Sequence, residues 1–271
     1  MSEEYILENE NESRRLAEKV DAAAWVARYC PKQLPKAGKF LDVGCGPGVI
    51  AAEIANHFAE ADVFGVDIES TRFTYLGSRC PSNLSLIQGD VNQLPFDDCG
   101  FDYVQCRFLL EYLRSPERAL AEMFRVLKPG GRLLLQDLDG QLLWHYPEDP
   151  VVTRVLGVVL SSLSRTGFDP LVGRKLYTLT KLAGFLDVGV EVEPYHLFPG
   201  SVDDRTLSLW NMKLSHALPV MAKAMNCERQ AEDAKEHFLN YLRREDRFTY
   251  SVMMTVVARR DYGKLADEVS M

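Results

Sequence analysis

The sequence lacks the long apolar run and the excess of basic side chains on which two large classes of protein depend. No apolar segment approaches the roughly 20 residues that a membrane-spanning helix needs. Acidic side chains outnumber basic ones by 39 to 31, and the resulting net charge of -8 repels the phosphates of a nucleic acid. We therefore expect neither a membrane span nor a nucleic-acid partner.

The sequence also lacks paired cysteines. Its six cysteines include no C-x-x-C pair, which is the spacing typical of zinc clusters. We expect free thiols, as in a reducing compartment, and no metal site. The first residues, MSEEYILENENES, are acidic and polar, whereas a secretory signal begins basic and then turns apolar. A cytoplasmic protein is predicted, and its oligomeric state is left open.

Short strand-like runs alternate with helical patterns between residues 38 and 140, and one of these helices is expected after Ser70. Strand followed by helix, repeated four times, predicts an α/β fold with a doubly wound, mostly parallel, Rossmann-like sheet. The strand-like runs are FLDV, DVFGVD, LSLIQGD, FDYVQC and GRLLLQDL.

Helical patterns flank this core on both sides. Apolar spacings of three and four predict one helix over residues 8–29. Two later strand-like runs, LDVGVEVEPYHLF and RFTYSVMMTVVARR, enclose about fifty helical residues, which predicts an antiparallel edge strand and a helical cap. The expected division is an N-terminal helical lid (1–36), a ligand-binding core (37–140), a C-terminal part (141–260) with the cap inserted at about 199–246, and a tail (261–271).

Three alternating glycines, Gly44, Gly46 and Gly48, follow the first strand and open a helix. Ligands of doubly wound sheets bind at such strand ends, and glycine permits their close approach to the backbone. A P-loop is excluded because no lysine follows the glycines. A dinucleotide fits the spacing of the glycines to Asp67, but Pro47 removes one N–H donor from the loop.

A short-chain reductase is the enzyme class that a dinucleotide would imply. Tyr177 and Lys181 have its Tyr-x-x-x-Lys spacing, with Ser164 upstream. Glycine and proline residues between Ser164 and Tyr177 interrupt the helix that would hold these side chains together. The reductase remains the weaker alternative.

Aspartates at the strand ends favour a cationic adenosyl ligand over a phosphate. The sulfonium and ammonium groups of S-adenosylmethionine are attracted by carboxylate oxygens. We expect Asp67 to accept hydrogen bonds from both ribose hydroxyls and Ile68 to cover the adenine. Asp90 is expected to bind the adenine amino group, and the N–H of Val91 a ring nitrogen.

Five sequence blocks resemble the class I S-adenosylmethionine-dependent methyltransferases, in the branch of ubiquinone and menaquinone biosynthesis C-methyltransferases and natural-product enzymes. The blocks are LDVGCGPG (41–48), VDI (66–68), GDVNQLPF (89–96), FDYVQCRFLLEYL (101–113) and EMFRVLKPGGRLLL (122–135). The resemblance implies S-adenosylmethionine as cofactor, S-adenosylhomocysteine as product and a small-molecule acceptor.

The resemblance also assigns roles to individual positions. Arg107 and Phe108 would face the acceptor, and Tyr5 would close over the cofactor. Cys106 would supply a carbonyl oxygen to the cofactor amino group, with Asp42 close by. The remaining positions, which would line the methionine portion and the ribose, are Gly44, Cys45, Gly46 and Gly48.

The acceptor and any general base are less well defined by the sequence. Among the polar residues after the last core strand, His145 is the candidate base, ahead of Asp137, Asp139 and Tyr146. A partly hydrophobic acceptor is indicated by aromatic and apolar residues of the C-terminal part (141–260) and its cap. These are Trp144, Phe168, Tyr195, Phe198, Trp210 and Met212. A protein that binds S-adenosylmethionine or S-adenosylhomocysteine without catalysis stays open as an alternative.

Overall fold

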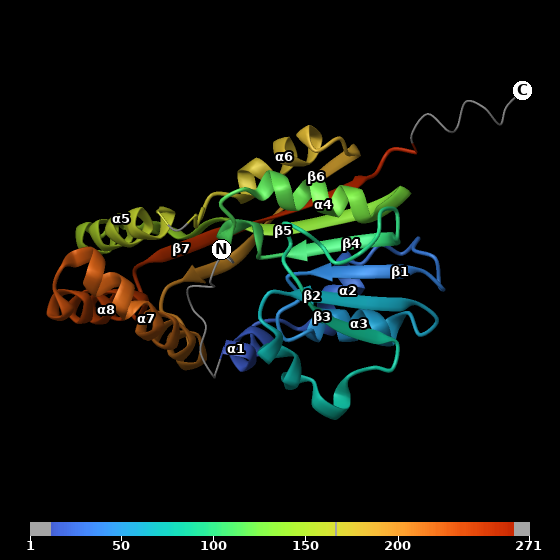
Figure 1. The fold of residues 1–271 in the computed structure, drawn as a ribbon. Coiled ribbons are helices and arrows are strands. Elements are labelled where there is room, and N and C mark those ends of the chain that lie inside the picture. Colours follow the sequence, from blue (N-terminus) through green and yellow to red (C-terminus); the bar gives the residue numbers. More distant parts are fainter. Residues whose placement is uncertain (1–11, 166, 263–271) are drawn as a thin grey trace, which may run out of the picture.

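The computed structural model describes residues 12–165 and 167–262, built on a sheet in the strand order β3-β2-β1-β4-β5-β7-β6. Strands β1 to β5 pair in parallel, and β7 runs antiparallel to both β5 and β6 (Figure 1). The expected α/β fold with a mostly parallel, doubly wound sheet is thus confirmed. The strands are β1 (Lys39–Val43), β2 (Asp62–Asp67), β3 (Leu84–Gln88), β4 (Phe101–Arg107), β5 (Leu127–Tyr146), β6 (Leu186–Pro199) and β7 (Phe248–Arg259).

Helices cover both faces of the sheet and give two separate apolar cores. On one face α2 (Ala22–Tyr29) and α3 (Val49–His57) bury Trp25 and Ile54 against the sheet. On the other face α4 (Pro116–Val126) and α6 (Leu176–Leu182) bury Met123 and Leu176. Because β1 to β5 pair in parallel between these layers, the carboxyl ends of β1 to β4 lie along one edge of the sheet.

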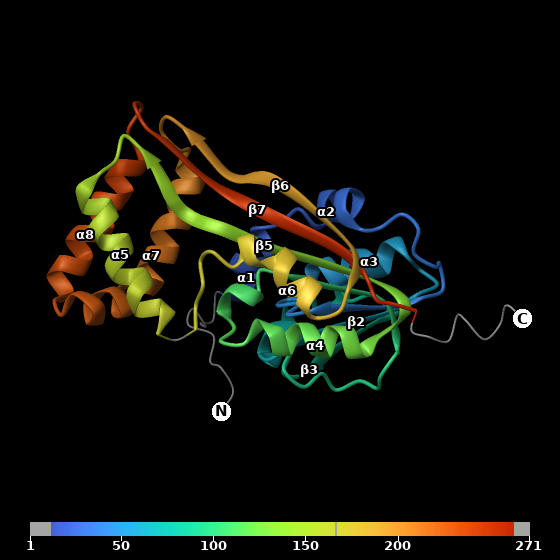
Figure 2. The ribbon, with the colours of Figure 1, turned by 90° about the horizontal axis from the view of Figure 1, so that it is seen from above.

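Strands β5, β7 and β6 continue beyond the other strands as a long arm (Figure 2). The expected end of β5 lay near Leu138, but its pairing with β7 resumes after an irregular stretch and reaches Tyr146, opposite Phe248. Three helices pack at the far end of the arm (Figures 1 and 2), with an apolar core of their own that includes Val152 and Phe238. They are α5 (Pro150–Ser164), α7 (Asp204–Met225) and α8 (Glu228–Leu242).

Two helical expectations need correction. The single helix expected over residues 8–29 is two helices where it is described, α1 (Glu12–Glu18) and α2. Asp21 separates them because its carboxylate caps α2 by accepting a hydrogen bond from the Ala24 N–H at 3.0 Å. The helix expected after Ser70 is a pair of 3-10 turns, η1 (Ser70–Tyr75) and η2 (Gly77–Arg79). Two more such turns are η3 (Leu110–Tyr112) and η4 (Gly173–Lys175).

Within the described ranges, no helix combines the length and the apolar character that crossing a bilayer requires.

A buried hydrogen-bond chain ties α2 to the centre of the sheet. Trp25 Nε1 donates to Gln136 Oε1 at 2.7 Å, and Gln136 Nε2 donates to Thr255 Oγ1 at 2.8 Å. All three side chains are buried. These two hydrogen bonds therefore link α2, β5 and β7 through buried side chains.

Replacing Trp25 with phenylalanine should lower the free energy of unfolding by about 1–3 kcal/mol. The change keeps an aromatic ring but leaves Gln136 Oε1 buried without its donor. Urea denaturation measures the loss, and Trp144→Phe, at a residue 38% exposed, is the matched control. Equal losses in both variants would contradict a stabilising role for this hydrogen bond.

Candidate functional site

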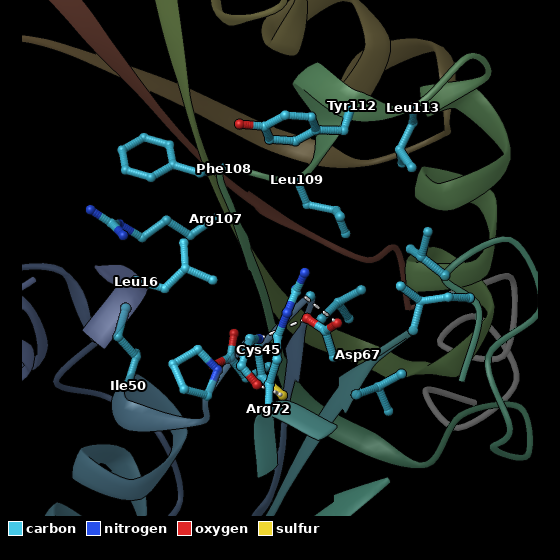
Figure 3. A pocket seen from close by; sticks show the side chains of 18 of the residues that line it. Leu16, Cys45, Ile50, Asp67, Arg72, Arg107, Phe108, Leu109, Tyr112 and Leu113 are labelled. Carbon is cyan, nitrogen blue, oxygen red and sulfur yellow. Dashed lines mark hydrogen bonds and ion pairs between the residues drawn. The ribbon is translucent and has the colours of Figure 1, made fainter. Parts of the chain in front are cut away.

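A cavity of about 890 Å³ lies at the carboxyl ends of β1, β2, β3 and β4. Its size falls in the range of small-molecule sites, roughly 300–1,000 Å³. Figure 3 shows Cys45, Asp67 and Arg72 on one side and Phe108 and Tyr112 on the other. Leu16 of α1 also lines the cavity, so the first described helix forms part of its wall.

The glycine loop after β1 forms one wall of the cavity. Gly44 and Gly46 have positive φ angles of 71° and 55°. A methyl group at Gly44 would lie 2.8 Å from Leu109 Cδ2, which is closer than real atoms approach. The loop backbone therefore lies directly against the segment after β4, and only glycine permits that packing.

The carboxylate of Asp67, at the end of β2, holds the loop and an arginine. Its Oδ2 accepts from the Gly46 N–H at 2.8 Å, and its Oδ1 accepts from the Glu69 N–H at 3.0 Å. Arg72 Nη1 lies 3.2 Å from the same Oδ1, and both side chains of this ion pair are buried. Arg72 belongs to η1 and lines the cavity, a placement that the sequence analysis did not anticipate.

Asp42 at the end of β1 is the second carboxyl at this wall. Burial raises the pKa of Asp42 to about 7, and the neighbouring Gln105 and Arg107 only partly offset this effect. Near neutral pH the side chain is therefore present in both protonation states. A cation placed beside it would favour the ionised state.

The opposite wall is the segment that follows β4, together with α1. The Arg107 guanidinium carbon lies 3.9 Å from the centre of the Phe108 ring, and Lys19 Nζ lies 4.6 Å from the same centre. Phe108 packs edge to face on Tyr195 of β6 at 5.2 Å. Burial, and then the charge of Arg107, lower the pKa of Lys19 to about 8. This wall thus combines cations with aromatic rings.

Glu111 of η3 lies in the same wall with its carboxyl group almost fully enclosed. The residue is 2% exposed, and Oε2 has no hydrogen-bond partner among the described residues. Its N–H donates to Asp137 Oδ2 of β5 at 3.2 Å. Its carbonyl oxygen accepts from the Asp169 N–H at 2.7 Å. The backbone is therefore held on both sides of a carboxyl group that faces the cavity.

The structure brings most of the expected site residues together at this cavity. Gly48 and Cys106 do not line it: Gly48 is the N-cap of α3, and Cys106 is buried inside β4. Tyr5 lies outside the described residues. The expected residues that line the cavity are Asp42, Gly44, Cys45, Gly46, Asp67, Ile68, Asp90, Val91, Arg107 and Phe108.

His145 is placed away from the cavity. It lies on the arm, where Nδ1 is 2.9 Å from Thr249 Oγ1 and the ring packs on Tyr241 of α8 at 5.3 Å. The elongation of β5 carries it there, and the geometry provides no contact with a ligand in the cavity. Phe198 and Trp210 likewise pack in the apolar core of the cap.

The residues of the reductase alternative are not assembled at the cavity either. Tyr177 is 48% exposed on α6, and Ser164 is the last residue of α5, where its hydroxyl donates to the Ser161 carbonyl. Neither lines the cavity.

Several cavity residues were missed by the sequence analysis. Glu111 carried a weak signal, since it is a lone acidic residue in the apolar run FLLEYL. Lys19 and Arg72 carried none, because their approach to the cavity depends on how α1 and η1 fold back over the strand ends.

Comparison with known proteins identifies the central part of the chain. Residues 41–135 match a family model described as a methyltransferase domain. An uncharacterized methyltransferase of Schizosaccharomyces pombe is 31% identical over 161 residues, which are 55% of this chain and 56% of that protein. A demethylmenaquinone methyltransferase of Renibacterium salmoninarum is 38% identical over 99 residues, which are 36% of this chain and 40% of that protein. The chain spans about half the length of the curated relatives it matches.

Solved structures support the fold. Phosphoethanolamine N-methyltransferase 2 of Haemonchus contortus, in complex with phosphomonomethylethanolamine and S-adenosylhomocysteine, superimposes with a TM-score of 0.60. The match covers 96% of this chain and 60% of that chain at 16% identity, so it bears on architecture alone. Residues 41–135, which match the methyltransferase domain model, supply both the glycine loop and the wall that faces it.

Proposed function

We propose that the protein transfers a methyl group from S-adenosylmethionine to a small, partly hydrophobic acceptor. One observation carries this proposal: the glycine loop of a methyltransferase domain borders a cavity, and the buried carboxyl groups of Asp42 and Asp67 lie on the loop's side of it. Bound there, the cofactor would supply an electrophilic methyl group on a sulfonium.

The residues at the cavity fit this cofactor. Asp90 is the proposed partner of the adenine amino group, and its Oδ1 accepts hydrogen bonds from the Asn92 N–H at 2.8 Å and from Asn92 Nδ2 at 3.0 Å. A methyl group at Gly46 would meet nothing closer than Leu16 Cδ1 at 3.6 Å, so the loop backbone is open to the cavity. The proposed cofactor residues are Asp42, Gly44, Cys45, Gly46, Asp67, Ile68, Asp90 and Val91.

Asp67 is the proposed partner of the ribose hydroxyls. A carboxylate has about four acceptor positions, and three hydrogen bonds already reach Asp67, one of them from Arg72. The ribose would therefore use the remaining position or replace Arg72.

The acceptor would occupy the part of the cavity nearest the wall after β4. Phe108, Leu109, Tyr112 and Leu113 give that part an apolar and aromatic surface. Leu16 of α1 encloses the same space, which favours the exclusion of water from the reacting groups. Curated relatives named for quinone methylation support an acceptor of this kind.

We also propose a cytoplasmic location without nucleic-acid partners. The six cysteines are all free thiols, which suits a reducing compartment, and the net charge of -8 disfavours phosphate backbones.

A panel of ligands tests the proposed function. The melting temperature should rise with S-adenosylmethionine and S-adenosylhomocysteine and stay unchanged with NADH and NADPH, because only a ligand that binds the folded state stabilises it. Transfer of a labelled methyl group to small hydroxyl or amine acceptors then separates an enzyme from a protein that binds the cofactor without catalysis. Stabilisation by NADH or NADPH alone would contradict the proposal.

Gly44→Ala should raise the Kd of S-adenosylmethionine at least about tenfold, equivalent to ~1.4 kcal/mol. The new methyl group forces the loop and Leu109 apart and displaces the backbone that faces the ligand. Gly77→Ala is the matched control, since Gly77 shares the positive φ angle but a methyl group there meets no atom within 4 Å. Calorimetry showing the same Kd for both variants would disprove a role for this close packing in binding.

Binding of S-adenosylmethionine should strengthen as the pH rises from 5.5 to 7.5. The pKa of Asp42 is about 7, so below that value a cationic ligand has to displace a proton from the carboxyl group. The affinity should fall by up to about tenfold per pH unit below pH 7, and Asp42→Asn should flatten this dependence. Calorimetry at each pH measures it, with Asp62→Asn at an exposed carboxylate as control. A dependence that persists in Asp42→Asn would show that another group is responsible.

A further inference from the structure

The buried carboxyl group of Glu111 has no function in binding the proposed cofactor. It lies on the wall after β4, across the cavity from the glycine loop that would hold the cofactor. Leu109, two residues earlier, is the side chain that packs against Gly44. Glu111 therefore lies in the wall beside which an acceptor would meet the methyl group.

Burying a carboxyl oxygen without a hydrogen-bond partner costs free energy, so the placement of Oε2 requires an explanation. The residue is 2% exposed, and among the described residues no donor reaches that oxygen. A ligand group that brings a proton to Oε2 would complete its hydrogen bonding.

We propose that Glu111 takes the proton of the acceptor during methyl transfer, and that the acceptor is an acidic hydroxyl on a flat, conjugated ring. This inference rests on the proposed function. The hydroxyl proton passes to Glu111 Oε2, and an oxygen lone pair forms the new O–CH3 bond. The electron pair of the broken S–CH3 bond stays on sulfur, so atoms and charge balance.

A second carboxyl group, that of Asp137, lies beside Glu111. Asp137 is fully buried, and its Oδ2 accepts from the Glu111 N–H. Burial raises the pKa of both groups, the Glu111 carboxylate further raises the pKa of Asp137, and the charges of Lys19 and Lys213 partly offset the rise at Glu111. A base whose pKa is raised toward neutrality is a better proton acceptor than an ordinary carboxylate. The charged and titratable groups that face Glu111 are Lys19 just after α1, Lys213 of α7, Tyr112 of η3, Asp137 of β5 and Asp169.

The chemical class of the acceptor follows from the rest of the wall. Phe108 and Tyr112 offer faces and edges to a flat ring. Lys19 and Arg107 stand at the same wall and stabilise an oxyanion, whereas they repel the ammonium form of an amine. A conjugated hydroxyl is the group that is both planar and acidic enough to lose its proton to a carboxylate.

A chromogenic phenol tests this without knowledge of the natural acceptor. 4-Nitrophenol is bound to the protein saturated with S-adenosylhomocysteine at about pH 6, where the free probe is mainly neutral. The absorbance of the phenolate should appear on binding to the natural protein and to the exposed control Glu60→Gln. In Glu111→Gln it should be largely lost, while the Kd of S-adenosylhomocysteine changes less than about twofold.

Labelled methyl transfer to the same probe provides the kinetic readout. Glu111→Gln should lower kcat by about 10²–10⁴-fold, the usual contribution of a general base. In the same variant, the rate should no longer decline toward acidic pH. Glu111→Asp retains a carboxyl group, so it should recover part of the rate, and that rate should again decline toward acidic pH. This recovery distinguishes proton transfer from a structural effect. The variant also serves as the test if Glu111→Gln does not fold.

Lys19 is the competing base, because its pKa is about 8. Lys19→Met should weaken binding of the phenolate but keep the acidic decline of the rate. Loss of that decline in Lys19→Met and not in Glu111→Gln would overturn the proposal, as would failure of the probe to bind at all. Failure of every variant and the natural protein to bind S-adenosylhomocysteine would instead refute the proposed function.

Discussion

The site depends on one close approach, between the backbone of Gly44 after β1 and the side chain of Leu109 after β4. A single methyl group at Gly44 would come within 2.8 Å of Leu109 and force the two loops apart. Because the loops do close on each other, the glycine loop and the segment after β4 become facing walls of one cavity. The Gly46 N–H extends this arrangement to β2 by donating to Asp67.

Parallel strands concentrate buried charge at the edge where they end. Three buried aspartates lie at this edge of the sheet: Asp42 on β1, Asp67 on β2 and Asp137 on β5. Among the described residues, Asp67 forms an ion pair with the buried Arg72. The others respond to burial through raised pKa values, which makes them sensitive to the charge of any ligand that enters.

The arm built by β5, β7 and β6 connects the cavity to the cap. Tyr195 on β6 packs on Phe108, and Lys19, in the turn after α1, lies over both rings. Three parts of the chain that are distant in sequence therefore meet at one wall. The cap helices α5, α7 and α8 have their own apolar core, so they hold the far end of the arm without contributing to the core beneath the sheet.

The sequence alone determined the succession of strands and helices, the glycine loop and the aspartates at the strand ends, because these features are local and parallel strands bring their ends to one edge. Tertiary structure decided which other side chains reach that edge. Arg72 pairs with Asp67 because η1 folds back as a 3-10 turn instead of the expected helix. His145 was carried to the cap because β5 goes on pairing with β7, a partner about one hundred residues away. Glu111 and Lys19 both line the cavity because the segments that carry them pack together. These segments are far apart in the chain, so the sequence does not indicate that they are close in space.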